Sequence, residues 1–247
     1  MSTLPGTYTY KDKNSGNSIT VDTSADVFYP TSTTNILLSG VRTRVHQEVN
    51  TVLDLGCGCG VVAIALGKLI LPHAQIYASD ISEEAAQLTR RNAEHHQLSI
   101  DCRSGSLFEP WQGMRFDVIV DDVAGVSEPI ARLSGWYPPQ IHSDADEDGT
   151  RWIVKILEQA GAYLSPQGQF FFPVLTLSDE TKILSTAQDH FANVELISTQ
   201  WYPFGKELLA HMEVIEDLMN RGKIRVKKEG SRFLWATLVY LATNDGN

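Results

Sequence analysis

Cysteine is scarce in this chain of 247 residues, and long hydrophobic runs are missing. Only three cysteines occur, which agrees with a reducing compartment. No apolar run of about 18 residues is present to cross a membrane, and the N-terminus has no secretory pattern. We therefore expect a soluble protein of the cytoplasm that has no membrane partner.

Basic residues are also few. Twenty Lys and Arg stand against thirty Asp and Glu, which gives a net charge of −10. This balance disfavours broad electrostatic binding to a nucleic-acid backbone or an anionic membrane. With 43% hydrophobic residues, the chain can bury a large core and fits a single α/β domain over residues 1–247. The sequence leaves open whether the protein forms a homodimer.

The cysteines do not have the pattern of a metal site. Cys57 and Cys59 form a C-x-C, and Cys102 follows on a later predicted strand. Tetrahedral zinc needs more ligands than the sequence offers nearby, whereas a cofactor-binding turn requires small side chains. We therefore expect no metal.

The stretch Thr51–Gly60, TVLDLGCGCG, predicts a strand, a turn and the start of a helix. Its apolar residues suit a buried parallel strand, and the glycines at 56, 58 and 60 allow backbone angles and close approach that a side chain would block. Asp80 ends a second apolar run about 20 residues later, where an acid can bind two ribose hydroxyls. Together these features indicate an adenosine-type cofactor.

The G-x-G-x-G spacing, the preceding Asp54 and the later Asp80 resemble the Class I S-adenosylmethionine-dependent methyltransferases. The resemblance implies S-adenosyl-L-methionine as cofactor. It also implies a Rossmann-like seven-stranded, mostly parallel α/β sheet with helices on both faces and an antiparallel last strand. In this family the glycine turn holds the methionine end, and Ser106 stands where an acid commonly contacts adenine. The implied cofactor-binding residues are Asp54, Gly56, Cys57, Gly58, Gly60, Asp80, Ile81, Ser106, Leu107 and Asp121.

A second segment narrows the resemblance. The sequence VFYPTSTTNILL at 27–38 is similar to the P-x-P-x-T-E segment of the release-factor glutamine N5-methyltransferases, with Pro30 and Thr34 retained and Asn35 replacing the acid. The likeness extends to about residue 173. Its Ser/Thr series predicts a helix that runs to about residue 45. Residues 1–45 are then interpreted as an N-terminal arm followed by a helix that acts as a lid over the site. The alternative is that this helix is an ordinary capped helix with no such role.

Hydrophobic periodicity and turn residues predict the other elements. Helices are expected over 61–70, 82–97, 149–164, 179–190 and 207–220. Strands are expected over 100–103, 116–120, 169–173, 193–201 and 233–242, with a turn at SPQG, 165–168. About 30 residues separate the last two strands, so residues 203–231 are interpreted as an insertion that walls the substrate pocket.

The loop after the fourth strand is where chemistry is expected, because ligands lie beyond the carboxyl ends of such strands. The family resembled has Asn-Pro-Pro-Tyr there, whereas this chain has Asp121, then Asp122 at the Asn position, then Val-Ala-Gly. A carboxylate accepts hydrogen bonds and protons but cannot donate, which suits an acceptor with N–H or O–H donors rather than a glutamine carbonyl. Asp122 and Asp121 are the predicted catalytic residues; alternatively, one of them only caps the turn. The predicted substrate residues are Tyr29, Asp122, Tyr137, His142 and Tyr202.

These features predict a methyltransferase that acts on a nitrogen or oxygen of a small molecule or a protein side chain. One alternative is an RNA or nucleobase methyltransferase, because basic residues gather at 221–232; the other interpretation of that cluster is a solvated sheet edge. A further alternative is a non-catalytic module that only binds the cofactor, which the missing Asn-Pro-Pro-Tyr favours.

Overall fold

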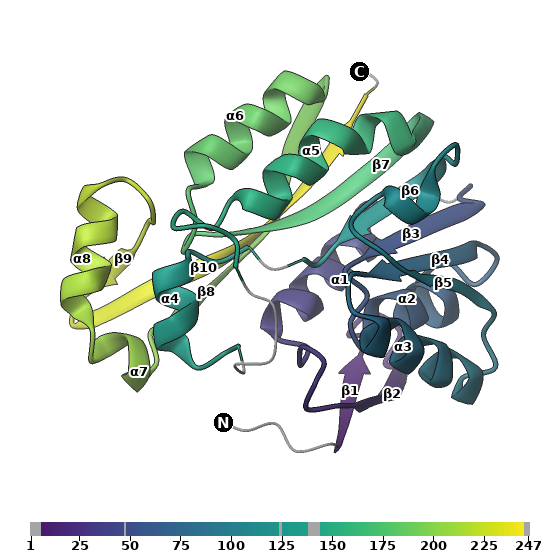
Figure 1. The fold of residues 1–247 in the computed structure, drawn as a ribbon, viewed down its shortest axis with the longest axis horizontal. Helices are drawn as coiled ribbons and strands as arrows, with labels where there is room; N and C mark the ends of the chain where they lie inside the picture. Colours follow the sequence, from purple (N-terminus) through teal and green to yellow (C-terminus); the bar gives the residue numbers. More distant parts are fainter. Residues whose placement is uncertain (1–5, 47, 124, 138–143, 245–247) are drawn as a thin grey trace.

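A single eight-stranded sheet forms the centre of the protein (Figure 1). The computed structural model describes residues 6–46, 48–123, 125–137 and 144–244. Seven strands follow the order β5-β4-β3-β6-β7-β10-β8, and a short β9 pairs with β10. Their bounds are β3 (Thr51–Leu55), β4 (Gln75–Asp80), β5 (Ile100–Ser104), β6 (Phe116–Asp121), β7 (Leu164–Leu175), β8 (Asn193–Pro203), β9 (Lys227–Glu229) and β10 (Arg232–Thr243).

The predicted fold class is confirmed. Strands β5, β4, β3, β6 and β7 pair in parallel, and β10 runs antiparallel between β7 and β8. The chain proceeds outward from β3 to β5 and then returns to place β6 on the other side of β3. Strand order therefore reverses between β3 and β6, which is the point where open α/β sheets bind ligands.

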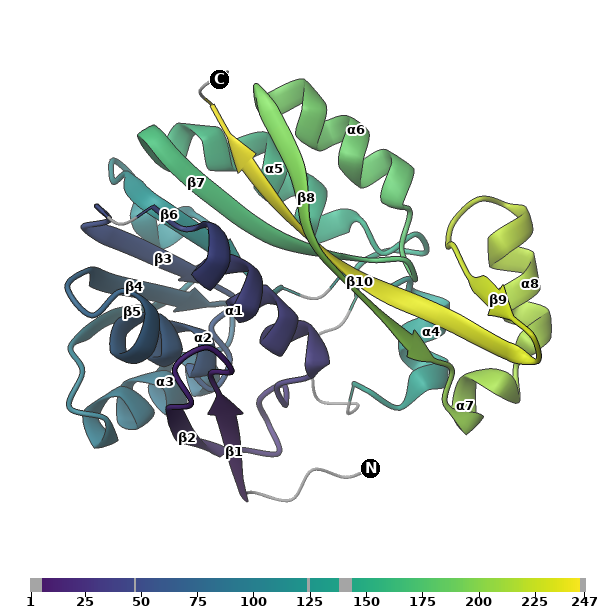
Figure 2. The same cartoon turned by 180° about the vertical axis from the view of Figure 1, so that it is seen from behind.

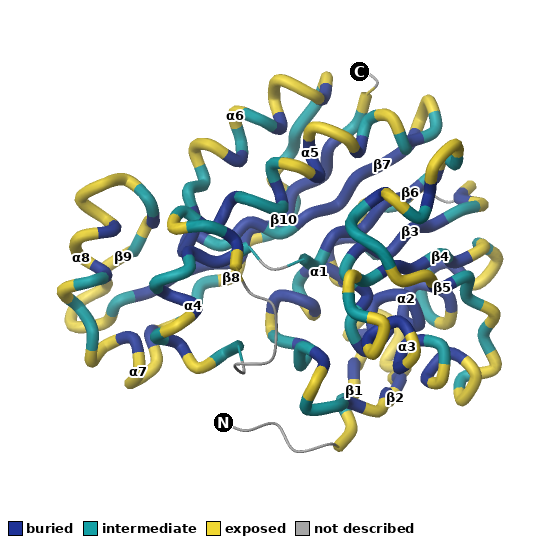
Figure 3. Tube along the Cα trace, in the orientation of Figure 1, coloured by how far each residue is buried: buried dark blue, intermediate teal, exposed yellow. Residues whose placement is uncertain are grey.

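Helices cover both faces of the sheet (Figures 1 and 2). One face packs against α1 (Ser32–Arg44), α2 (Val61–Ala65) and α3 (Glu83–His95), and the other against α5 (Arg151–Tyr163) and α6 (Glu180–His190). Because side chains alternate along a strand, Phe171 joins the first core while Phe170 and Phe172 join the second. Figure 3 shows the resulting buried strands between helices whose outer sides are exposed.

Two helix starts follow directly from the sequence. The hydroxyl of Ser82 accepts from the backbone N–H of Ala85 at the start of α3, and that of Thr31 accepts from Thr33 at the start of α1. The helix predicted over 61–70 is α2 followed by a π-helical turn, Leu66–Ile70. In the described part of the chain, no helix is long and apolar enough to cross a membrane.

The turn predicted at 165–168 is wrong, because these residues lie inside β7. Phe116 of β6 pairs with Leu164 but Val118 pairs with Gln169, so the extra residues of β7 form a bulge. The hydroxyl of Ser165 donates to Oδ1 of Asp117 at 2.8 Å, which holds the bulge against β6.

The insertion forms the far end of the molecule in Figure 1. Its predicted single helix is two, α7 (Lys206–Leu209) and α8 (Met212–Asn220), because the chain leaves helical geometry at His211. Both pack with α4 (Glu128–Ser134) in a third hydrophobic cluster that includes Trp235. Separate from the central sheet, a hairpin of β1 (Gly6–Lys11) and β2 (Ser18–Thr23) packs against α2 and α3.

Candidate active site

A cavity of about 910 Å³ lies at the carboxyl ends of β3, β4 and β6. The glycine turn after β3, the loop after β6 and the start of α1 all contribute to its lining. Seven described carboxyl side chains line it, against one basic side chain, Arg151. The seven acids are Asp26, Asp80, Glu83, Glu84, Asp121, Asp122 and Asp144.

The glycine turn forms one wall of the cavity. Gly56 and Gly58 have φ of 73° and 53°, in the region that favours glycine. A Cβ on Gly56 would lie 2.7 Å from Cγ2 of Val123, so a larger residue would displace the loop after β6. Cys57 also lines the cavity. These three predicted cofactor residues therefore lie together at one wall.

Gly60 does not line the cavity, contrary to its prediction as a cofactor residue. Its φ is 81°, and a Cβ there would lie 3.0 Å from the side chain of Thr89 on α3. The residue is small because α3 passes close to it. Its part in the site is indirect, since it lets the turn and α3 pack together.

Asp54 is a second predicted cofactor residue that does not line the cavity. Its side chain is fully buried, and Oδ2 accepts from the backbone N–H of Ala63 at 3.0 Å. Burial and the nearby Asp122 raise the pKa of Asp54 well above its usual range. No described residue hydrogen-bonds its Oδ1. Asp54 supports the start of α2 from beneath the turn.

Asp80 lines the cavity at the end of β4, where an acid was predicted. Its Oδ2 accepts from the N–H of Gly58 at 3.0 Å, and its Oδ1 from the N–H of Ser82 at 2.9 Å. Burial raises its pKa despite these bonds. The carboxylate thus joins the glycine turn to α3. Ile81, Ser106 and Leu107 also line the cavity.

Two carboxylates lie at the carboxyl end of β6, at the floor of the cavity. Oδ1 of Asp121 accepts from the N–H of Val123 at 2.9 Å, and the side chain is only 2% exposed. Oδ2 of Asp122 accepts from the hydroxyl of Thr34 on α1 at 2.8 Å. Burial raises the pKa of Asp121 to about 8 and that of Asp122 to about 7. Asp121 therefore also caps the turn, whereas the partner of Asp122 comes from 88 residues away.

Aromatic side chains also line the cavity. Tyr137 lines the cavity, and its ring stacks on Phe28 with centroids 5.1 Å apart. Burial raises the pKa of the Tyr137 hydroxyl. Trp136 and Trp235 also line the cavity, with centroids 5.1 Å apart. Among these, the sequence predicted Tyr137 as a substrate residue, whereas Phe28 and Trp235 needed the tertiary structure.

Two predicted substrate residues, Tyr29 and Tyr202, do not line the cavity. Tyr29 does not line the cavity and packs edge-on against Tyr8 at 5.6 Å. Tyr202 lies against Trp235 at 4.7 Å, outside the lining, and His142 falls outside the described residues. None of the described lining residues belongs to 203–231, so the insertion supports Trp235 rather than walling the pocket.

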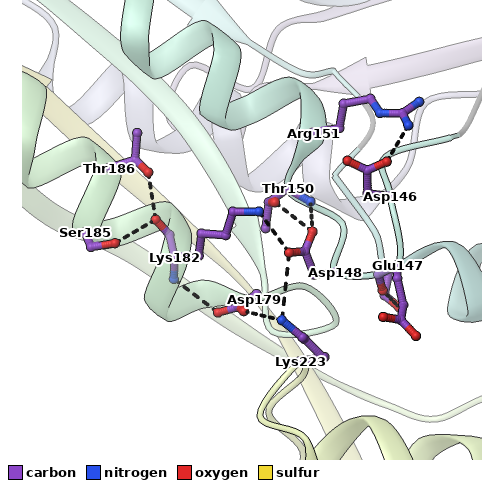
Figure 4. A network of polar contacts seen from close by, with 11 residues as sticks. Asp146, Glu147, Asp148, Thr150, Arg151, Asp179, Lys182, Ser185, Thr186 and Lys223 are labelled. Carbon is purple, nitrogen blue, oxygen red and sulfur yellow. Dashed lines mark hydrogen bonds and ion pairs between the residues drawn. The ribbon is translucent and has the colours of Figure 1, made fainter.

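A charged network holds the loop before α5 (Figure 4). Asp148 accepts from the hydroxyl of Thr150 at 2.7 Å and from Lys182 at 3.0 Å, and Lys223 of the insertion lies 4.0 Å from it. Arg151 pairs with Asp144 at 2.7 Å and also with Asp146. This loop carries Asp144 and leads into Arg151, so the network fixes one rim of the cavity.

The basic cluster of the insertion is mostly paired. Arg221 contacts Glu147 at 2.8 Å, Lys223 contacts Asp179 at 3.3 Å, and Arg225 contacts Glu180 at 2.9 Å. Lys227 contacts Glu229 at 2.5 Å. Lysines and arginines already matched with carboxylates are poor partners for phosphates, which favours the interpretation of this cluster as a solvated edge.

The chain is similar in sequence to known methyltransferases. Residues 19–122 match the family model of the methyltransferase small domain. The release factor glutamine methyltransferase of Geobacter sulfurreducens is 35% identical over 148 residues, which are 58% of this chain and 51% of that relative. The ribosomal protein uL3 glutamine methyltransferase of Xanthomonas campestris is 32% identical, over 70% of this chain and 58% of the relative. The chain thus spans between half and three fifths of the length of these relatives.

Solved structures share the fold at low identity. The 16S rRNA N2 G1207 methyltransferase of T. thermophilus, in complex with AdoMet and guanosine, aligns with a TM-score of 0.62 at 16% identity, over 98% of this chain and 51% of that one. A ribosomal protein L11 methylase from Lactobacillus delbrueckii subsp. bulgaricus aligns with a TM-score of 0.54 at 18% identity, over 86% of this chain and 80% of that one. The glycine-lined cavity agrees with these comparisons, and the match over residues 19–122 together with the sequence relatives supports a class I S-adenosylmethionine-dependent methyltransferase of the methyltransferase-small group.

Proposed function

We propose that this protein transfers the methyl group of S-adenosylmethionine to a nitrogen or oxygen of a small molecule or a protein side chain. One observation carries the proposal: the glycine turn, Asp80 and the pair Asp121–Asp122 line the same cavity. A cofactor wall and a proton-accepting group therefore meet in one enclosed space.

The residues of the cavity fit the cofactor. Gly56 leaves its wall free of a side chain, and Asp80 offers a carboxylate for the ribose hydroxyls. Leu107, with φ of 49°, turns the backbone after β5 along the same wall, where we place the adenine contact. When bound, the cofactor supplies a methyl group on a positively charged sulfur. The protein then aligns the acceptor and manages its proton, and we assign the second task to Asp122.

Calorimetry with S-adenosylmethionine and with its demethylated product tests the cofactor half of the proposal. Incubation of cell extract with cofactor labelled in the methyl group tests the acceptor half. Absence of heat with both ligands would contradict the proposal. Cofactor binding without methylation of any extract component or of a broad acceptor panel would instead favour the non-catalytic module.

We expect the affinity for S-adenosylmethionine to rise with pH. Burial raises the pKa of Asp121 to about 8, and a cation beside this carboxyl favours its charged form. Binding therefore releases protons, so affinity should increase as pH rises through about 7 to 8 and then level off. The demethylated product has a neutral sulfur and should show a weaker dependence. Calorimetry across this range checks the slope, and equal slopes for both ligands would argue against it.

Thr34 is expected to act as a positioning residue for Asp122. Its hydroxyl donates to Oδ2 of Asp122 and lowers the pKa of that carboxyl against the effect of burial. Thr34→Val should move the acid limb of the pH–rate profile, which reports the ionisation of Asp122, to higher pH, and Thr34→Ser should restore it. Turnover at pH about 6.5 should fall about tenfold in Thr34→Val. If the pH–rate profile of Thr34→Val were the same as that of wild type, Thr34 would serve packing alone.

A further inference from the structure

The charged side chains that line the cavity are mostly acidic. Seven described carboxyl groups line it, and its one basic lining residue, Arg151, is already paired with Asp144 and Asp146. Seven carboxyl groups outnumber the two cationic groups of the cofactor, its sulfonium and its ammonium. An anionic acceptor would find no free cation among the described lining residues, whereas a cationic one would be attracted.

Asp121 and Asp122 each have one carboxylate oxygen that is free to accept a hydrogen bond from a ligand. Within the described chain, Oδ2 of Asp121 and Oδ1 of Asp122 receive no hydrogen bond, although Asp121 is only 2% exposed. Both side chains line the cavity, so these oxygens are available to a ligand. A carboxylate oxygen that receives no hydrogen bond from the described chain can accept from a cationic donor of a ligand. Two such groups suit two cations, one at the sulfonium and one at the acceptor.

The loop after β6 has few free hydrogen-bond donors for the carbonyl of a substrate amide. A planar amide needs an acceptor for its NH₂ and a donor for its carbonyl. The side chains of Asp121, Asp122 and Val123 donate nothing in their charged or apolar forms. The N–H of Asp122 already donates to Leu55 at 3.2 Å, and that of Val123 donates to Asp121. In their charged forms, these three residues therefore offer no free donor to a glutamine carbonyl.

Aromatic faces lie near these carboxylates. Tyr137, stacked on Phe28, and the pair Trp136 and Trp235 supply rings along the same cavity. Ring faces attract cationic nitrogen and pack against apolar groups. Carboxylate and aromatic rings together suit an ammonium group carried on an apolar stem.

We infer that the methyl acceptor is an aliphatic amine next to an aromatic or apolar group, recognised by the open oxygen of Asp122 and the rings around Tyr137; this inference rests on the proposed function. The ammonium group binds as a cation and passes one proton to Asp122. The freed nitrogen lone pair then forms the N–CH₃ bond as the C–S bond breaks, with that electron pair remaining on sulfur. The product leaves as a methylammonium ion, and Asp122 returns its proton to water.

Three probes of nearly equal shape test the inference: 2-phenylethylamine, phenylacetamide and phenylacetate. Each is titrated by calorimetry into protein saturated with the demethylated cofactor, so that binding is read without turnover. The amine should bind saturably and at least about tenfold more tightly than the amide, and the carboxylate should not bind. Mass spectrometry with S-adenosylmethionine should then detect methylation of the amine alone.

The variant Asp122→Asn keeps the shape and removes the charge. It should weaken amine binding about tenfold or more while the demethylated cofactor binds within a few-fold of wild type. Asp101→Asn, on β5 outside the cavity and paired with Arg103, is the matched control and should change neither. Amide binding as tight as amine binding, no saturable amine binding, or an unchanged Asp122→Asn would overturn the inference. Failure of the proposed function would appear earlier, as loss of cofactor binding itself.

Discussion

Asp80→Ala should lose most of its affinity for S-adenosylmethionine. We propose that the carboxylate accepts from two ribose hydroxyls, and hydrogen bonds to a charged group are each worth about 1.5–3 kcal/mol. The same carboxylate also binds the N–H groups of Gly58 and Ser82, so the turn loses its tie to α3. We expect the dissociation constant to rise at least about 100-fold, measured by calorimetry.

Asp101→Ala is the control for this loss. Asp101 lies on the neighbouring strand, outside the cavity lining, and pairs with Arg103 at 2.6 Å. Its removal should leave cofactor affinity within a few-fold. Circular dichroism on both variants separates loss of binding from loss of fold. An Asp80→Ala protein that is folded and binds within a few-fold of wild type would refute the ribose contact.

Asp122→Ala should reduce turnover about 100-fold or more, while cofactor affinity changes only a few-fold. The reason is that its proposed partner is the acceptor, and a positioned proton-accepting group is typically worth about 10²–10⁴ in rate. Single-turnover kinetics with an acceptor found in the labelled extract, beside calorimetry with the cofactor, measures both quantities on the same protein.

Asp144→Asn provides the matched control, because it removes another cavity-lining carboxylate that already has Arg151 as a partner. Its turnover should stay within a few-fold. Abolished cofactor binding in Asp122→Ala would place that carboxylate in the cofactor site and remove its acceptor role. Equal losses in both variants would point to overall charge rather than to a specific contact.

The fold could be predicted from local pattern because each element carries its own signal. The glycines after β3, the acid after β4 and the Ser82 cap are set by backbone geometry within a few residues. Strand order then follows from parallel pairing. The bulge in β7 carried no such signal, because its polar SPQG letters are those of a turn, and only the hydrogen bond to Asp117 keeps them in the strand.

The acids of the site could be predicted from the sequence, whereas most of its aromatic residues could not. Asp80 and the Asp121–Asp122 pair follow strands, and strand ends meet at one edge. Tyr29 and Tyr202 have the same side chain as Tyr137. Which of the three rings reaches the cavity depends on packing between distant segments of the chain. The Thr34–Asp122 hydrogen bond spans 88 residues, and the only sequence signal for it was the retained threonine of the 27–38 segment.

Asn92 joins the N-terminal hairpin to the cofactor turn. Its side-chain amide accepts from the N–H of Asp22 and donates to the carbonyls of Asp22 and Cys59. During synthesis the hairpin emerges first, but its anchor is made 70 residues later. A lone two-stranded hairpin is marginal in water, so it gains its structure only after α3 has been translated. The order of assembly is therefore the reverse of the order of synthesis at this end of the chain.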